Sequence, residues 1–509
     1  MSTTGNVQLT INDNGGASAI VTAAPSVVAI FGVSSIGTAN TPISTRSVST
    51  LTSTFGYGPL VELGALLISQ GATVIATKCA QTAAGTATVP SGESGGSAVT
   101  TTLDATAGAF DMYFCQLNIT QGGTVGGAGQ TIRFEVSLDA GRTFGPVQVV
   151  DVATAPTTFA IPNTGITLNF SAGTIVAGDQ IKFSTKEPKT SAANVATAIA
   201  ALGNSAYALS GWGSMIVHGA AASADAFSTA DTATINTALD TLATGQLYDR
   251  CFVNVRDAIY PTAWGGAGET DSTDATALIA ASTARNAKRV SACAGYYNVP
   301  SAIANTVAST PRYRRPCSWA IQARKTLVQV QTLSSRVKDG PLTTVVVDTT
   351  NDPTDGFVYH DERVNPGLDA AGYASLWTRL QQGSGFFVRS ENLFSPIGSD
   401  FDLFAVGQCF DNFCNVLVRY FTTQIDESVR TNSNGTIYEN DAQQLESGAL
   451  AAVAAAMPGQ YQAPNTSVTI DRSYNVMVNK KAKVSGTFGQ LGYIREFDLT
   501  VQLQNPLSA

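Results

Sequence analysis

Histidine is the side chain that most often moves protons or binds transition metals in enzymes, and this chain of 509 residues contains two, His218 and His360. They form no HExxH zinc motif and leave little material for a Ser-His or Cys-His relay. Seven cysteines are spread from Cys79 to Cys414 without a CxxC pair, which predicts reduced, mostly buried thiols. For Cys409 and Cys414, on a predicted helix, a role as small apolar core residues is favoured.

One segment, Gly92–Gly96, matches the GxSxG pattern of serine hydrolases. That motif requires an apolar strand before the serine and a helix after it, because the turn between them exposes the hydroxyl. Here the segment lies in Ser-, Gly- and Thr-rich sequence, and we interpret it as a chance match. The glycines of Gly486–Gly492 have the wrong spacing for a dinucleotide-binding loop, and the sequence has no GxxxxGK[ST] phosphate loop. We therefore predict that the protein is not an enzyme and binds no cofactor.

Two short charged runs are candidate binding sites. His360–Glu362 could bind a cation, although an exposed loop beside Asp355 and Gly356 explains these side chains as well and is favoured. Arg312–Arg315 is the densest basic run, which in an acidic chain is a weak signal for nucleic acid. A surface that forms salt bridges with an acidic protein partner is the favoured interpretation, and we predict no metal site.

Three acidic residues, Asp411, Asp426 and Glu427, lie on a predicted helix over 403–430. A solvated or partner-facing side of this helix explains them without catalysis. The same helix carries an apolar stripe at helical spacing, made of Phe410, Phe413, Leu417 and Phe421.

The composition argues against nucleic acid and membrane as direct partners. The formal net charge is −8, so the chain has no basic field for wrapping nucleic acid. No apolar run approaches the ~20 residues of a membrane span, and the N-terminus lacks the pattern of a signal peptide, from which we expect a protein made and kept in a cytoplasm. Gly, Ala, Ser and Thr are abundant and 13% of the residues are charged, which suits extended packing surfaces and β-rich modules.

Both ends of the chain alternate apolar and polar residues, the period of a strand with one buried face. The apolar positions are Val7, Leu9 and Ile11 near the start and Phe497, Leu499, Val501 and Leu503 near the end. A terminal strand cannot bury such a face alone, so each must join a sheet in its own molecule or in a neighbour. Since proteins usually protect free sheet edges, these ends indicate assembly.

Between the ends, the order of elements predicts three units. Segments 25–84 and 189–385 alternate buried strands and helices, which predicts one discontinuous, layered α/β domain. Segment 85–188 has short strands and Gly/Asp turns without helices, which predicts an inserted all-β sandwich or barrel at the surface. Segment 386–509 combines helices with short strands in an α+β domain that includes the C-terminal arm, and residues 1–24 form the N-terminal arm.

Several local signals place individual elements. Ser399-Asp400 is predicted to cap the helix that follows, and Thr436 with Glu439 is predicted to form a capping box for a second helix. Tyr474–Val478 is predicted to be a strand, and Thr273–Lys288 a helix.

The first strand–helix–strand segment resembles a known family. The apolar strand Val27–Gly32 leads into a loop with Gly37 and Pro42, then Phe55-Gly56, and a helix that runs into Gln70–Ala76. This order is similar to the N-terminal core of contractile tail sheath proteins. Many members of that family begin with a Pro-Gly-Val-Tyr type segment, which this chain lacks.

The end of the chain resembles the same family. A long helix that carries Asn415–Tyr420 is followed by a second helix and a β-rich end. The inserted segment, with Ser137–Gly145, resembles surface insertions that some phage sheaths carry. The resemblance covers about 25–80 and 390–509.

The resemblance implies a structural subunit of a contractile bacteriophage tail. Such subunits form stacked hexameric rings around a tail tube protein, with baseplate and tail terminator proteins as further partners. Contraction drives the tube through the host envelope for genome delivery. The resemblance also implies a virion protein that is assembled in the host bacterial cytoplasm.

In this family neighbouring subunits are joined by strand exchange. The two alternating ends are then the exchanged strands, and Gly15, Gly16, Gly489 and Gly492 are hinges that let subunits move while they stay joined. Two alternatives remain: another self-assembling virion or surface-layer protein, and an uncharacterised hydrolase with a carboxylate site in the α/β domain.

Overall fold

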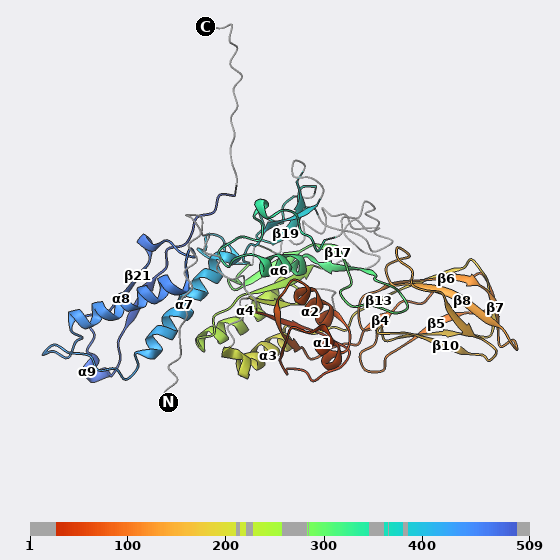
Figure 1. Cartoon of the computed structure of the whole chain (residues 1–509), viewed down its shortest axis with the longest axis horizontal. Helices are drawn as coiled ribbons and strands as arrows, with labels where there is room; N and C mark the ends of the chain where they lie inside the picture. Colours follow the sequence, from red (N-terminus) through yellow and green to blue (C-terminus); the bar gives the residue numbers. More distant parts are fainter. Residues whose placement is uncertain are drawn as a thin grey trace, which may run out of the picture.

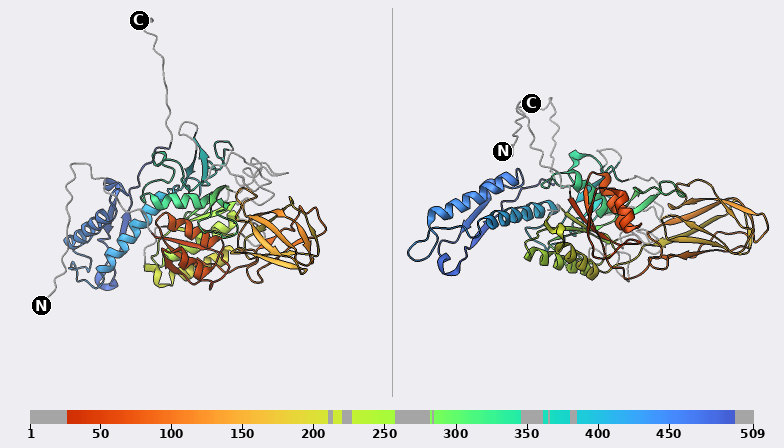
Figure 2. Two further views of the ribbon diagram at one scale, coloured as in Figure 1. Left: turned by 45° about the vertical axis from the view of Figure 1, so that its right-hand side comes forward. Right: turned by 60° about the horizontal axis from the view of Figure 1, so that its bottom comes forward.

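The computed structural model describes residues 27–209, 214–219, 227–256, 282, 285–345, 361–364, 366–379 and 385–495. Helices and strands are mixed in this part of the chain, and the strands form several separate sheets. An all-β unit, an α/β layer and a helical lobe lie in a row (Figure 1, Figure 2). The prediction of a mixed α/β and α+β chain is therefore confirmed, whereas the domain boundaries stay predictions.

The α/β layer is built on a six-stranded sheet in the order β16-β15-β14-β1-β3-β2. All its strands are parallel except β2 (Ile43–Thr45), which pairs antiparallel with β3 at the edge. The parallel strands are short apolar runs, as expected for strands that are covered on both faces. They are β1 (Val27–Gly32), β3 (Thr73–Lys78), β14 (Ser214–Val217), β15 (Cys251–Arg256) and β16 (Val290–Ala294).

Helices cover both faces of this sheet, each with its own apolar cluster. One face packs against α1 (Val48–Phe55), α2 (Pro59–Ser69) and α6 (Cys317–Leu327). The other face packs against α3 (Ala192–Gly203) and α4 (Thr229–Thr244). Two buried faces make the layer a rigid centre for the units at its ends.

Local sequence signals set the ends of these helices. Pro59 occupies the first turn of α2, where its missing amide costs nothing, and Gly71 follows the helix with φ +87°. Ser191 caps α3 through its side chain. Ser228 and Asp231 form a capping box at the start of α4.

The all-β unit is inserted between β3 and α3. Its two ends lie side by side, where the Thr82 amide donates to the Lys189 carbonyl (2.7 Å). Leu117, Phe134 and Leu168 lie in a core of its own. Its sheets are β4-β13-β6-β8-β9, β10-β11-β5 and β12-β7. The strands are β4 (Thr86–Ala87), β5 (Val99–Leu103), β6 (Phe114–Gln121), β7 (Gly123–Val125), β8 (Thr131–Ser137), β9 (Gln148–Asp151), β10 (Thr157–Ile161), β11 (Ile166–Phe170), β12 (Gly173–Ile175) and β13 (Gln180–Lys186).

Two hairpins extend the α/β layer. The first, β17 (Tyr296–Pro300) with β18 (Arg312–Pro316), leads into α6. Val307, in the connection between these strands, joins the core of the all-β unit and so links the two units. The second hairpin is β19 (Ser375–Thr378) with β20 (Phe386–Ser390).

The helical lobe, named here the C-terminal lobe, contains the last elements of the described chain. They are α7 (Phe404–Thr423), α8 (Glu439–Ala456), β21 (Ser467–Ile470), α9 (Val476–Asn479) and β22 (Val484–Thr487). The first half of α7 is buried against the α/β layer, and its second half is only partly buried. The helix therefore runs from the centre of the molecule into the lobe (Figure 1).

Some predicted elements are wrong. Helix α9 occupies much of Tyr474–Val478, because the Asn475 side chain accepts from the Val478 amide (2.9 Å) and caps a helical turn. Ser399-Asp400 lies before α7 but does not cap it: Leu403 is the N-cap residue and makes no side-chain cap.

The capping box of Thr436 and Glu439 does not form either. The Thr436 hydroxyl bonds to Asn434 in a tight turn, and Glu439 pairs with Arg472. Most of Thr273–Lys288 lies outside the described residues. No helix of the described residues is both long and apolar enough to cross a membrane.

Candidate assembly interface

Most residues predicted to join subunits lie outside the described part of the chain, so their role stays a prediction. They are Val7, Leu9, Ile11, Gly15, Gly16, Phe497, Leu499, Val501 and Leu503. The structure does describe Gly489, Gly492 and the nearest sheet, β21–β22. That sheet can be assessed as the place where an added strand would bind.

The β21–β22 sheet has an open edge. Its strands pair antiparallel in a register that sets Ile470 opposite Val484, and one pair further the Asp471 amide donates to the Lys483 carbonyl (2.9 Å). Asp471 and Lys483 are therefore a hydrogen-bonded pair, and such pairs alternate with pairs that make no backbone hydrogen bonds to each other. Val484 and Gly486 belong to the second kind, so their amides and carbonyls point away from β21. Among the described strands only β21 pairs with β22. The outer side of β22 can therefore accept a strand.

The opposite edge, on β21, is occupied. The Ile470 amide donates to Oε1 of Glu446 on α8 (2.6 Å), and Arg472 Nη2 lies 2.9 Å from Oε2 of the same carboxylate. The hydrogen bond from Arg472 lowers the pKa of Glu446, so this group stays charged. A strand added beside β21 would have to displace it, which favours β22 as the accepting edge.

An apolar helix face lies beneath β22. A Cβ at Gly486 would lie 3.1 Å from Leu417 and 3.2 Å from Phe413, so a residue without a side chain lets the strand approach α7 closely. Phe488, just after β22, packs edge-on or tilted against Phe410 (5.9 Å) and Phe413 (5.5 Å between ring centroids). Since Leu417 is only partly buried, an added strand with one apolar face would find a surface to cover.

The two predicted hinge glycines differ in their surroundings. Gly489 is held by two hydrogen bonds, from its amide to Thr466 Oγ1 (3.0 Å) and from the Gln462 amide to its carbonyl (2.8 Å). Gly492 has open space where a side chain would lie. Their role as hinges is untested and stays a prediction.

After Gly492 the chain lies on the α/β part of the molecule. The Tyr493 hydroxyl donates to the Gln331 carbonyl (2.7 Å), and Arg495 Nη2 lies 3.0 Å from Asp369 Oδ1. Arg495, the last described residue, therefore lies on this surface and not at the edge of β22.

The basic run Arg312–Arg315 is not a surface for an acidic partner, and that prediction is wrong. Arg314 and Arg315 are buried. Arg315 binds Asp111 through two bonds, Nη1 to Oδ1 (2.7 Å) and Nη2 to Oδ2 (2.6 Å), and its guanidinium lies over the Trp319 ring. The run lies at the joint between the α/β layer and the all-β unit, so its acidic partner belongs to this same chain.

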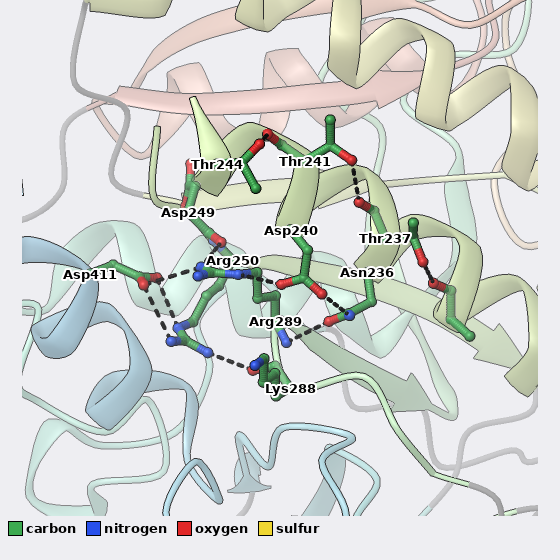
Figure 3. A network of polar contacts seen from close by, with 11 residues as sticks. Asn236, Thr237, Asp240, Thr241, Thr244, Asp249, Arg250, Lys288, Arg289 and Asp411 are labelled. Carbon is green, nitrogen blue, oxygen red and sulfur yellow. Dashed lines mark hydrogen bonds and ion pairs between the residues drawn. The ribbon is translucent and has the colours of Figure 1, made fainter. Parts of the chain in front are cut away.

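Asp411 is also not on a solvated face. It is buried, with Oδ2 2.9 Å from Arg250 Nε and Oδ1 3.2 Å from Arg289 Nη1 (Figure 3). The first contact is an ion pair in which the atoms are not aligned as a hydrogen bond. Asp426 and Glu427 are exposed as predicted, but the predicted helix over 403–430 is too long: α7 ends at Thr423, before both residues.

Asp361 and Glu362 are buried, so the favoured exposed loop is wrong for them. Asp361 accepts from the Thr378 amide (3.0 Å), and Glu362 from the Gly367 amide (2.8 Å). Both carboxylates have protein donors, and His360 lies outside the described residues. Within the described residues, no three His, Cys, Asp or Glu side chains gather as a metal site.

The other candidate catalytic groups serve structural contacts. His218 is buried, with Nε2 2.8 Å from Glu187 Oε1 and Nδ1 accepting from Trp319 Nε1 (3.2 Å). Ser94 lies in the loop between β4 and β5, and its hydroxyl donates to Asp179 Oδ1 (2.5 Å). The strand–turn–helix context of a nucleophile elbow is not found around Ser94.

Comparison with known proteins gives matches in structure alone. No protein-family model matches the chain, and no curated protein is similar to it. The chain is similar to a sheath tail protein from Desulfitobacterium hafniense, with 14% identity and a TM-score of 0.43 over 95% of this chain and 100% of that one. A sheath tail protein from Listeria innocua has 11% identity and a TM-score of 0.45 over 92% and 96%. The helical sheath of the anti-feeding prophage in its contracted state has 10% identity and a TM-score of 0.47 over 99% and 100%. These neighbours carry the name of the family that the sequence resembles, the contractile tail sheath proteins.

Proposed function

We propose that this protein is the structural subunit of a contractile tail sheath and polymerises by exchanging its terminal strands with neighbours. One observation carries the proposal: β22 has an open edge above a partly buried apolar helix, in a chain whose two ends both alternate apolar and polar residues. An accepting edge and donor strands are the two halves of β-strand addition.

The donor and the edge are complementary in two respects. An antiparallel or parallel donor strand would bond through alternate backbone groups to Val484 and Gly486. In an extended strand the alternating Val7, Leu9 and Ile11 would share one face, and that face would pack on α7. Backbone bonds supply affinity, and the apolar row sets the register.

The all-β unit, the α/β layer and the C-terminal lobe are joined so that the subunit can move as one rigid body. Asp411 joins the C-terminal lobe to the α/β layer, and Asp111 with Arg315 joins the all-β unit to that layer. With both joints closed by buried charge pairs, subunits would repack as rigid bodies. In this proposal hexameric rings stack around a tail tube between baseplate and terminator, and the extended state is held kinetically until contraction drives the tube through the host envelope.

The experiment blocks the edge without disturbing the β21–β22 ladder. In Val484→Pro the lost amide is one that points outward, so the pairing with β21 should survive. We expect a folded protein that no longer polymerises, whereas the control Val484→Thr, which keeps the amide, forms tubes of contracted-like sheath in electron micrographs. Deleting residues 1–16, or 496–509 so that Arg495 is kept, should also stop polymerisation. Normal tubes from Val484→Pro and from both truncations would overturn the proposal.

The same micrographs separate the structural alternatives, and an activity assay tests the hydrolase. A surface-layer protein would give flat sheets instead of hollow tubes, and another virion protein closed shells or narrow tubes. A hydrolase would turn over ester, peptide or glycoside substrates, and we expect no turnover.

A further inference from the structure

An arginine-rich cleft lies beside the point where the described chain ends. It has a volume of about 680 Å³ and is formed by the segment 331–337, the β19–β20 hairpin and Tyr493–Arg495. Its charged lining residues are Arg336, Arg379, Arg389, Arg495 and Asp369. Four cations against one anion is unexpected in a chain of net charge −8.

The carboxylates nearby do not neutralise this cleft. Asp369 is shared, with Oδ2 3.0 Å from Arg389 Nε and Oδ1 3.0 Å from Arg495 Nη2. Arg336 pairs with its own neighbour, Asp339 (2.6 Å). Among the described residues Arg379 has no carboxylate partner, so the cleft keeps a positive excess.

One donor in the cleft wall, on Arg379, and one on the neighbouring Trp377 lack acceptors. The guanidiniums of Arg379 and Arg389 lie 4.1 and 4.3 Å from the Trp377 ring centroid. Within the described structure, Arg379 Nε and Trp377 Nε1 have no hydrogen-bond partner. Burial and the nearby charge of Arg389 lower the pKa of Arg379, which an anionic ligand would reverse. Paired guanidiniums beside an aromatic ring are suited to carboxylates.

Exposed carboxylates are present elsewhere on the same chain. Asp426 and Glu427 follow α7, beyond its C-terminal end, and neither has an ion-pair partner in the described structure. Negative charge is unfavourable there, because the helix dipole is negative at that end, and the last turn of α7 has no basic residue to compensate. Their neighbour Ile425 is exposed, as is Ile494 in the cleft, so an apolar contact can accompany the charges.

The cleft and these carboxylates lie on different parts of the molecule. The β19 hairpin is on the upper side in Figure 1, whereas α7 descends toward the lower left. We propose that Asp426 and Glu427 of one copy bind in the arginine cleft of a second copy. The contact joins two different surfaces, so it repeats from copy to copy and favours an open polymer over a closed dimer. Its role in assembly rests on the proposed function, whereas the binding itself does not.

Binding is tested first without polymerisation. A labelled peptide of residues 421–429 is titrated into the full chain carrying Val484→Pro, and fluorescence anisotropy is read at low and high salt. We expect binding that weakens with salt and falls at least about tenfold with Arg379→Glu. Arg133→Glu, an equal charge change on an exposed position of the all-β unit, should leave it unchanged.

Equal binding of a peptide that carries Asp426→Lys and Glu427→Lys, or no effect of Arg379→Glu, would overturn the proposal. Inorganic phosphate is the second probe. If phosphate binds the cleft and the peptide does not, the cleft is a site for free anions and the proposal is wrong.

Charge exchange then tests the contact in the polymer. Arg379→Glu and Glu427→Arg should each raise the concentration needed for polymerisation about tenfold, and the two together in one chain should restore most of the loss. Failure of the double variant to recover would reject the contact. If the unmodified chain does not polymerise at all, strand exchange is rejected instead, and the peptide-binding result still stands.

Discussion

Asp411 on α7 and Arg250, next to β15, form an ion pair inside the joint between the C-terminal lobe and the α/β layer, with Oδ2 and Nε 2.9 Å apart. The same carboxylate reaches Arg289, whose Nε also lies 2.9 Å from Asp240 (Figure 3). The Asp411 carboxylate thus contacts two guanidiniums of the layer, and Arg289 has Asp240 as a second counter-charge. Burial itself lowers the pKa of Arg250, so the pair depends on Asp411 staying charged.

Replacing Asp411 by Asn should destabilise the folded protein by about 3–5 kcal/mol, because the buried Arg250 loses its ion-pair partner and Arg289 keeps only Asp240. Denaturant unfolding of the purified chain measures this. Asp426→Asn, an exposed substitution beyond the same helix, is the control and should change stability by less than about 0.5 kcal/mol. Similar values for both variants would show that the joint does not depend on the charge.

The pair between Asp111 and Arg315 should behave as a coupled unit. Asp111→Asn and Arg315→Met each leave one buried charge or polar group without its partner, so each should cost about 3–5 kcal/mol. The double variant should cost clearly less than their sum, because neither buried charge remains. Denaturant unfolding of all four proteins gives the coupling energy, and strict additivity would show that the two groups do not interact.

The strand–helix–strand segment could be predicted because its signals are local. Val27–Gly32 is a short apolar run, α2 has helical spacing, and Gly71 with φ +87° ends it, so each element is set by residues within it or beside it. The prediction of a strand over Tyr474–Val478 is wrong because a local signal decides this segment too. Its apolar pattern is too short to separate strand from helix, and the Asn475 cap decides the outcome.

The accepting edge and the buried charges could not be predicted in this way. Only the pairing register with β21 shows that Val484 and Gly486 point their backbone groups outward. Asp111 and Arg315 are 204 residues apart, so no pattern within either segment reveals the pair. The sequence alone therefore predicts a surface for a basic run whose acidic partner lies far away in the same chain.

Glu62 should make stability fall as pH rises. Burial raises its pKa from 4.5 to about 7, against the opposing charge of Arg315 and a hydrogen bond from Ser301. Between these two values the folded state binds more protons than the unfolded state, so this stabilisation is complete below about pH 4.5 and lost as pH rises through about 7. The loss is on the order of 3 kcal/mol.

The measurement compares wild type with Glu62→Gln by denaturant unfolding at several pH values in that window. The isosteric amide does not titrate, so its stability relative to wild type should increase with pH by about the same amount. Parallel pH profiles for the two proteins would contradict the assignment to Glu62.

The thiols should be almost unreactive in the folded protein. As predicted, they are mostly buried, and Cys414 alone is partly exposed. Burial raises the pKa of Cys79 and of Cys409 to about 12 and that of Cys414 to about 11, and the thiolate is the species that reacts. With a thiol reagent near neutral pH we expect slow labelling of Cys414 and seven labelled thiols after denaturation. Cys414→Ala should remove the native signal, and rapid labelling of several cysteines in that variant would show that the α/β layer opens in solution.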